Sequence, residues 1–133
     1  MKNLFAAVLC VLAVASCGNP ARAPVAVTES ARAHLLESAA NDFHQHVAPT
    51  GAQFRNVHVG VLHGEGEDAR NIMCGEFRTT DGSGWVAFAT IETDPYENWL
   101  GGAAENYCAG PNTALATDND LSDDLSGRYQ SLG

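Results

Sequence analysis

Basic residues are scarce in this sequence. One lysine and six arginines stand against 16 aspartates and glutamates, which gives a formal net charge of −9 at pH 7. The arginines do not cluster along the chain, so the protein surface repels phosphate backbones and anionic headgroups. This charge argues strongly against nucleic acid as a partner, whereas it permits cationic partners.

Long apolar runs are also missing. The longest one covers residues 4–14, directly after a short positive start at Lys2. A run of that length is too short for a transmembrane helix, which needs roughly 20 residues, but it suits the apolar core of an export signal. We therefore expect residues 1–16 to be a signal peptide and the rest of the chain to mature outside the cytosol.

The export signal ends in Val14-Ala15-Ser16-Cys17, which resembles the lipobox of bacterial lipoproteins. The resemblance implies acylation of Cys17, with two or more acyl chains holding the protein on a lipid bilayer at about 0.8 kcal/mol per buried methylene. Gly18, rather than aspartate, follows the cysteine, which in Gram-negative sorting favours the outer membrane, facing the periplasm. The alternative is an ordinary secretory leader in which Cys17 is incidental.

Motifs of catalysis and metal binding are absent or incomplete. There is no Gly-x-Ser-x-Gly elbow, no His-Glu-x-x-His and no phosphate-binding glycine loop. His44 and His46 are two residues apart in a helical segment, and His58 and His63 are five apart in a strand, so the members of each pair point apart. Residues 118–124 faintly resemble a calcium loop but lack its glycine and its final glutamate. We expect no metal and no cofactor, and the missing motifs favour a non-catalytic protein over an enzyme.

The length fits one domain with one modest core. Residues 17–27, with the lipidated cysteine, two prolines and small side chains, have the composition of a flexible tether. Residues 28–110 are expected to form the domain, and residues 111–133, with few large apolar side chains, to be a mobile acidic tail. Within that tail, Ser126-Gly127-Arg128-Tyr129 resembles the target-inserted loop of periplasmic lysozyme inhibitors, but the barrel strands of those inhibitors are absent.

Residues 28–47 have the pattern of an amphipathic helix. Apolar side chains recur at spacings of three and four, and Thr28 or Ser30 is available as the N-cap. Pro49 and Gly51 then end the helix, because the residue before a proline avoids helical geometry. One face of this helix is therefore expected to pack on the rest of the domain.

Three runs typical of strands follow at residues 54–62, 72–79 and 85–93, joined by two glycine-rich hairpin connections. The period of residues 96–109 is undecided, so this segment is either a short helix or a fourth edge strand. The expected core consists of apolar residues from the helix and the strands: Leu35, Leu36, Phe43, Val57, Val59, Val61 and Phe88.

Four cysteines are present. Cys10 is removed with the signal peptide and Cys17 is acylated, so Cys74 and Cys108 are left in an oxidising compartment, where we expect them to pair. A disulfide closing a loop of that length would stabilise the fold by about 4 kcal/mol. The alternative, a nucleophilic Cys74, has no recognisable partner motif.

Three short motifs resemble a family of small uncharacterised bacterial proteins. They are Phe54-Arg55-Asn56-Val57, Met73-Cys74-Gly75-Glu76-Phe77 and Gly82-Ser83-Gly84-Trp85, in the order and spacing of that family. The resemblance covers residues 49–108 and implies a compact exported module with an antiparallel sheet. The chain departs from the family pattern after Glu76, where Phe77-Arg78 replaces Val-Asn, and at Trp85, which replaces a tyrosine.

These observations predict an α+β fold with one disulfide, in which an N-terminal amphipathic helix packs on a three- to four-stranded antiparallel sheet. The preferred function is a membrane-anchored module that binds a protein or another envelope component through an exposed face of the sheet or through the region of Trp85, Tyr96 and Trp99. The alternative is a small-ligand or hydrolytic protein that uses Glu76 and a nearby histidine. The candidate binding residues are Arg55, Glu76, Trp85, Tyr96 and Trp99.

Overall fold

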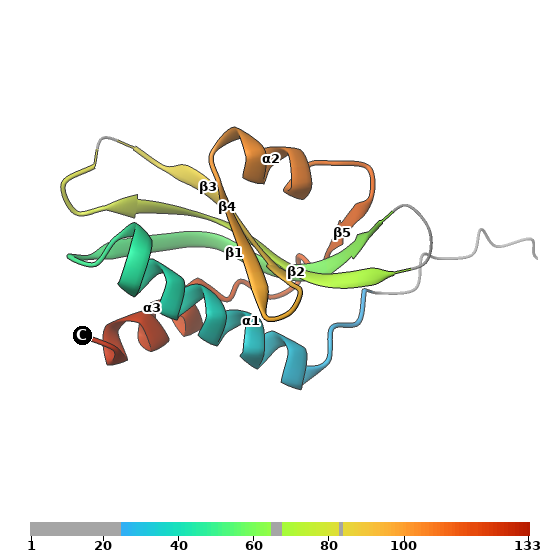
Figure 1. The fold of residues 1–133 in the computed structure, drawn as a ribbon, viewed down its shortest axis with the longest axis horizontal. Coiled ribbons are helices and arrows are strands. Elements are labelled where there is room, and N and C mark those ends of the chain that lie inside the picture. The colour runs from blue at the N-terminus through green and yellow to red at the C-terminus, as the bar shows by residue number, and fades with distance from the viewer. Residues whose placement is uncertain (1–24, 65–67, 83) are drawn as a thin grey trace, which may run out of the picture.

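The computed structural model describes residues 25–64, 68–82 and 84–133, so the expected signal peptide, Cys17 and most of the tether lie outside the described residues. The fold is α+β. Figure 1 shows a sheet with α1 and α3 on one side and α2 on the other. In chain order the elements are α1 (Glu29–Asp42), the π-helix η1 (Phe43–Val47), β1 (Ala52–His63), β2 (Ala69–Thr79), β3 (Val86–Glu92), β4 (Tyr96–Leu100), α2 (Gly102–Cys108), β5 (Thr113–Leu115) and α3 (Ser122–Ser131).

The sheet has five antiparallel strands in the order β4-β3-β2-β1-β5. The two hairpins expected from the glycine-rich connections are confirmed, because β1 pairs with β2 and β2 with β3. Residues 96–109 contain both of the elements between which the sequence did not decide, since β4 comes first and α2 follows. Among the described residues, no helix has the length and apolar character that a membrane span requires.

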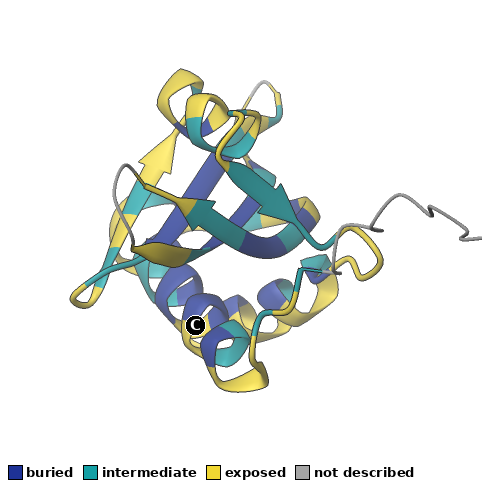
Figure 2. Ribbon diagram, turned by 90° about the vertical axis from the view of Figure 1, so that its right-hand side faces the viewer, coloured by how far each residue is buried: buried dark blue, intermediate teal, exposed yellow. Residues whose placement is uncertain are grey.

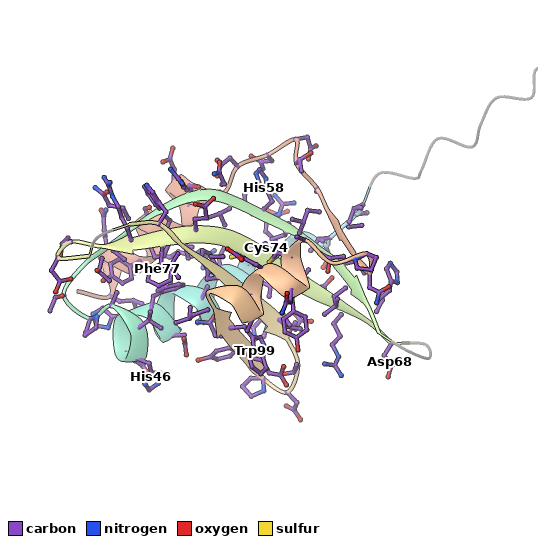
Figure 3. The ribbon with its side chains drawn as sticks, turned by 90° about the horizontal axis from the view of Figure 1, so that it is seen from above. His46, His58, Asp68, Cys74, Phe77 and Trp99 are labelled. Atoms are coloured by element: carbon purple, nitrogen blue, oxygen red, sulfur yellow. A yellow bond between two sulfur atoms is a disulfide. The ribbon has the colours of Figure 1, made fainter. Side chains whose placement is uncertain are left out.

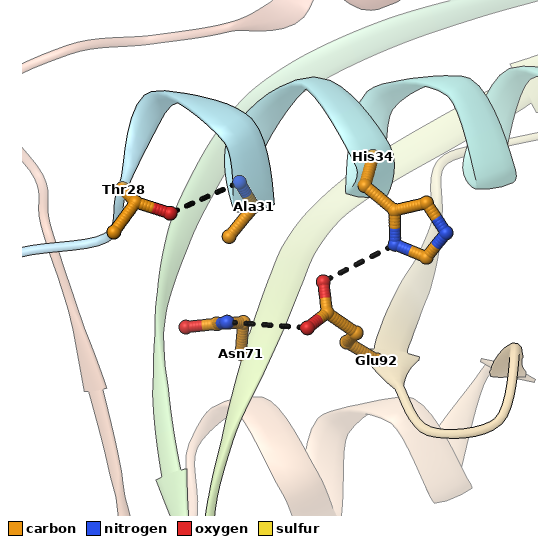
Figure 4. Close-up of polar contacts among 5 residues, drawn as sticks. All are labelled: Thr28, Ala31, His34, Asn71 and Glu92. Atoms are coloured by element: carbon orange, nitrogen blue, oxygen red, sulfur yellow. Dashed lines mark hydrogen bonds and ion pairs between the residues drawn. The ribbon is translucent and has the colours of Figure 1, made fainter.

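The predicted N-terminal helix is confirmed, including its cap. The Thr28 hydroxyl accepts a hydrogen bond from the Ala31 amide at 3.1 Å, which satisfies one of the amides that a helix start leaves without a partner. Figure 4 shows how the next turn contacts the sheet: His34 Nδ1 lies 3.2 Å from Glu92 Oε2, and Asn71 Nδ2 donates to Glu92 Oε1 at 3.5 Å. The capped end of α1 is therefore tied to β2 and β3.

The main core lies between the sheet and the pair α1 and α3. Phe43 is fully buried at its centre, with ring centroids 5.0 Å from Phe54, 4.8 Å from Phe77 and 5.0 Å from Phe88 in edge-on arrangements. Figure 2 shows the buried residues on the inner sides of the helices and along the middle of the sheet. Of the predicted core residues, only Val61 is incorrect, because it is partly buried rather than buried.

The prediction of a mobile acidic tail over residues 111–133 is wrong, because β5 and α3 of this segment pack against the rest of the domain. β5 pairs with β1, and Leu121, which directly precedes α3, packs in the main core together with Leu125 and Tyr129 of α3. The Tyr129 hydroxyl donates to the buried carbonyl of Ala48. These three residues are spaced four apart, which is the signal of a helical stripe. The Ser-Gly-Arg-Tyr fragment lies within this helix, so it does not form the loop that it resembles.

A second, smaller core lies under α2. It contains Ile72, Cys74, Ala89, Ile91 and Ala104. The predicted disulfide is present: Cys74 on β2 and Cys108 at the end of α2 are bonded across 34 positions of sequence. Because α2 has only seven residues, too few to be stable alone in water, this bond and the small core are what hold it on the sheet.

Candidate functional site

The face of the sheet that carries α2 has two uncovered ends. Successive side chains of a strand point to opposite faces, so β2 sends every second residue to this side. Those under α2, Ile72 and Cys74, belong to the small core. Figure 3, which looks onto this side, shows α2 crossing the sheet near Cys74. The residues beyond it are Asp68 and Arg70 at one end, and Glu76 and Arg78 at the other.

Arg55 and Glu76, two of the candidate binding residues, form an ion pair. The two residues are direct partners in the β1–β2 register. Arg55 Nη2 and Nε both donate to Glu76 Oε2, at 2.7 and 3.1 Å, and Asn56 Nδ2 donates to Oε1 at 3.4 Å. Both carboxylate oxygens of Glu76 are therefore occupied.

Trp85 lies beside this ion pair, next to two arginines. The Cζ atom of Arg55 is 4.2 Å from the centre of the Trp85 ring, and that of Arg78 is 4.9 Å away. Both distances are in the range in which a cation is attracted to the face of an indole. Arg78 Nε also donates to Gln53 Oε1 at 2.6 Å. We call Gln53, Arg55, Glu76, Arg78 and Trp85 the Trp85 cluster.

Sequence reasoning found three members of the Trp85 cluster and missed Gln53 and Arg78. The signal was present, because Arg78 follows Glu76 by two residues and so shares its face of β2. Gln53 is the register partner of Arg78. The pairing of β1 with β2 was expected, but its register could not be fixed from the pattern because of an irregularity at Asn56.

That irregularity is a β-bulge between Arg55 and His58. Asn56 takes a φ of 53°, in the left-handed region that asparagine tolerates better than most residues. The bulge turns the Val57 amide out of the ladder, and it donates to Asp120 Oδ1 at 3.2 Å. The Leu121 amide in turn donates to the Val57 carbonyl at 2.8 Å. The Phe-Arg-Asn-Val motif thus connects the Trp85 cluster to the start of α3.

Asp120 is the polar centre of this connection. Burial raises its pKa, but hydrogen bonds from the Ser122 side chain, the Ser122 amide and the Val57 amide outweigh that effect, so the pKa lies below its usual value. In its charged form Asp120 therefore accepts a hydrogen bond from the Ser122 amide, the first amide of α3, at 2.9 Å. This role accounts for one acidic residue of the segment that faintly resembled a calcium loop.

Gly75, in the second motif, lies where the core leaves no room for a side chain. A Cβ at this position would come within 2.8 Å of both Val57 and Phe88. The absence of a Cβ therefore lets the Phe88 ring reach the centre of the main core. The glycine of the Cys-Gly-Glu motif is explained by packing.

Two predicted binding residues, Tyr96 and Trp99, lie outside the Trp85 cluster, and their side chains do not contact each other. The Tyr96 hydroxyl donates to Asp42 Oδ1 on α1 at 2.9 Å, and burial followed by this hydrogen bond raises the pKa of Tyr96. Trp99 points to the other face, where its ring lies 5.7 Å from that of Tyr107 on α2. They are three residues apart on one strand, and alternation places them on opposite faces.

The histidines are dispersed. His44 lies near the Tyr129 ring, with the ring centroids 6.1 Å apart, and His58 Nδ1 lies 3.0 Å from the Asn119 carbonyl oxygen. His63 is at the end of β1. Within residues 25–64, 68–82 and 84–133, no three histidine, cysteine or acidic side chains group closely enough to hold a metal ion.

The chemistry of Glu76 suits binding better than hydrolysis. The hydrogen bonds from Arg55 are the main reason that its pKa lies below the usual value, and they outweigh the opposing effect of burial. A general acid needs the opposite, a raised pKa that keeps the proton at neutral pH. The nearest histidine along the register is His58, which pairs with Cys74 and contacts Asn119. Among the described residues, no hydrogen bond joins Glu76 to a histidine.

Comparison with protein-family models, with curated proteins and with solved structures finds no match to this chain. The function is therefore argued from the arrangement of the side chains alone.

Proposed function

We propose that this protein is a lipid-anchored module of the bacterial envelope, and that it binds a partner protein through the Trp85 cluster without catalysis. The observation that carries the proposal is the cluster itself, in which Arg55 and Arg78 lie at the ring of a partly buried tryptophan. Tryptophan and arginine are the residues most often found to dominate binding energy at protein interfaces.

The charge of the cluster indicates the chemistry of the partner surface. Arg55 neutralises Glu76, so Arg78 gives the Trp85 cluster an excess positive charge, although the net charge of the chain is −9. Among the described residues, Arg78 gives only its Nε hydrogen to a hydrogen-bond partner, Gln53. The terminal nitrogens can therefore form charge-assisted hydrogen bonds with carboxylates of the partner.

The position of the cluster agrees with a membrane tether. Figure 1 shows the chain entering the domain at the right-hand side, where α1 begins, while the starts of β1 and β3 lie at the left. Arg55 is in the first part of β1, and Trp85 directly precedes β3. A tether over residues 18–26 could span about 30 Å at roughly 3.3 Å per residue. Such a tether would leave the Trp85 cluster directed away from the bilayer.

The anchor is tested with Cys17→Ala in the full-length protein, with Cys10→Ala as the matched control. Radiolabelled palmitate should be incorporated into the wild type and the Cys10→Ala variant and be absent from Cys17→Ala, which should leave the membrane fraction. Equal labelling of all three proteins, or labelling of none, contradicts the anchor.

The binding surface is tested by crosslinking in living cells of the producing bacterium. A photoreactive amino acid replaces Thr80, an exposed residue two positions after Arg78, and in a control it replaces Glu37, exposed on α1. The expected result is a discrete protein adduct from position 80 that is absent from position 37 and is lost when Arg78→Glu is added. An absent adduct at position 80, or one that Arg78→Glu leaves unchanged, contradicts this assignment.

A further inference from the structure

A cleft lies at the other end of the α2-side face, beyond α2 from the Trp85 cluster. Its walls are the end of β1, the start of β2, one flank of α2 and the turn over residues 110–113, and its volume is about 470 Å³. That volume is within the range of roughly 300–1,000 Å³ that small-molecule sites occupy. The cleft shares no lining residue with the Trp85 cluster, so it is independent of the proposed function.

The walls of the cleft are held by covalent and hydrogen bonds. The disulfide from Cys74 to Cys108 fixes the end of α2 to the sheet. The Thr113 hydroxyl donates to the Tyr107 carbonyl at 2.5 Å, and the His63 amide donates to the Asn112 carbonyl at 2.9 Å. A small ligand would therefore enter a site that is already formed, which lowers the cost of ordering it.

The lining combines opposite charges with amides and an apolar floor. Asp68, which directly precedes β2, and Arg70, the second residue of β2, both line the cleft. No ion pair within 4 Å joins these two residues, both of which the structure describes. The other residues that matter here are Leu62, Asn106, Tyr107 and Asn112.

We propose that this cleft binds a small zwitterion of the amino-acid type, either a free α-amino acid or a short peptide. The ligand carboxylate pairs with Arg70 and the ligand ammonium with Asp68, while its side chain packs on Tyr107 and Leu62. A simple anion would be repelled by Asp68 and a simple cation by Arg70, whereas a zwitterion satisfies both. The amides of Asn106 and Asn112 supply further donors and acceptors.

The test uses the isotope-labelled full-length protein titrated with L-phenylalanine and L-leucine. Two analogues isolate the charges: N-acetyl-L-phenylalanine lacks the ammonium, and L-phenylalaninamide lacks the carboxylate. The amino acids should shift the amide resonances of Leu62, Asn106 and Thr113, and each analogue should bind about tenfold more weakly. No shift with millimolar amino acid, or analogues that bind as tightly as phenylalanine, overturns the proposal.

Substitutions then assign each charge. Arg70→Ala should weaken phenylalanine binding about tenfold and abolish the preference over phenylalaninamide. Asp68→Asn should abolish the preference over N-acetylphenylalanine. The matched control is Arg78→Ala, which removes an arginine from the same strand and the same face at the far end. If Arg78→Ala weakens binding as much as Arg70→Ala does, the cleft is not the site.

Discussion

The two ends of the α2-side face begin from the same charge pattern and differ in what surrounds it. At each end of β2 an acidic residue is followed two positions later by an arginine: Asp68, just before the strand, with Arg70, and Glu76 with Arg78. At the second end, Arg55 pairs with Glu76 and Trp85 lies against Arg78. At the first end the pair lines an open cleft. The comparison teaches that neighbouring residues, rather than the charges themselves, decide whether such a pair forms a compact surface or a pocket.

The element that separates the two ends is α2. It is short, and the disulfide and the small core hold it over the middle of the sheet. One end consequently has a helix as a wall, while the other has none. The following predictions test this division, beginning with the largest expected effect.

Removal of the disulfide should have the largest effect and should act unevenly. The double substitution Cys74→Ala and Cys108→Ala frees a segment closed across 34 positions, so the free energy of unfolding should fall by about 4 kcal/mol. Denaturant titration measures this change. In the protein that remains folded, amide resonances along the cleft should shift more than those of β1 near Arg55. An unchanged free energy of unfolding would contradict the role given to the bond.

Leu125→Ala should destabilise the whole domain rather than one end of the α2-side face, because Leu125 packs on the other face of the sheet. Leu125 is fully buried in the main core, and its truncation should lower the free energy of unfolding by about 3 kcal/mol. Leu132, which is 41% exposed at the end of the same helix, gives the matched control, and Leu132→Ala should change stability by less than about 0.5 kcal/mol. Equal effects of the two substitutions would mean that α3 does not pack as described.

The unpredicted packing of α3 shows why the C-terminal segment was missed. Its sequence from Pro111 is rich in polar and acidic residues, and composition outweighed the pattern of Leu121, Leu125 and Tyr129. The apolar stripe of these three residues is narrow. The surface on which it packs is formed by α1 and β1, and no local sequence pattern shows that these distant segments meet it. Conversely, the helix over residues 28–47 was predictable, because its N-cap and its apolar spacing are both signals within the segment itself.

The ion pair of the candidate site was predictable from the sequence, but which aromatic residues lie beside it was not. Arg55 and Glu76 come from motifs at matching positions of two adjacent strands, and they do pair. Trp85, Tyr96 and Trp99 were expected in one region, but β4 turns the last two to opposite faces. Tyr96 and Trp99 are three residues apart, so they would share a face in a helix but take opposite faces in a strand, and the period of this segment was undecided.

Trp85→Ala should have a moderate effect at one end only. It removes the ring from the two guanidinium groups, and the free energy of unfolding should fall by about 1 kcal/mol. Arg70→Ala, at the cleft end, removes no contact of this kind and should change it by less than about 0.5 kcal/mol. Thermal denaturation of the two variants side by side measures the difference in stability. A larger loss of stability in Arg70→Ala than in Trp85→Ala would contradict this prediction.

Acid should produce the smallest effect, again at the Trp85 cluster. Arg55 lowers the pKa of Glu76 below the ordinary 4.5, so the ion pair contributes its full stability above that value and loses it as the pH falls through the lowered pKa. Side-chain exposures of 47% for Arg55 and 33% for Glu76 keep the contribution below about 1 kcal/mol. Stability curves from pH 7 to pH 3 should therefore differ between wild type and Glu76→Gln, converging at the acid end. Parallel curves would show that the pair contributes nothing.

The claim that a partner protein binds the Trp85 cluster and not the cleft end is tested most directly by one paired crosslinking measurement. Full-length protein with the photoreactive residue at position 80 is compared in living cells as Arg78→Ala and as Arg70→Ala. The account predicts at least a tenfold loss of the partner adduct in Arg78→Ala and an unchanged yield in Arg70→Ala. Equal yields in the two variants would contradict it.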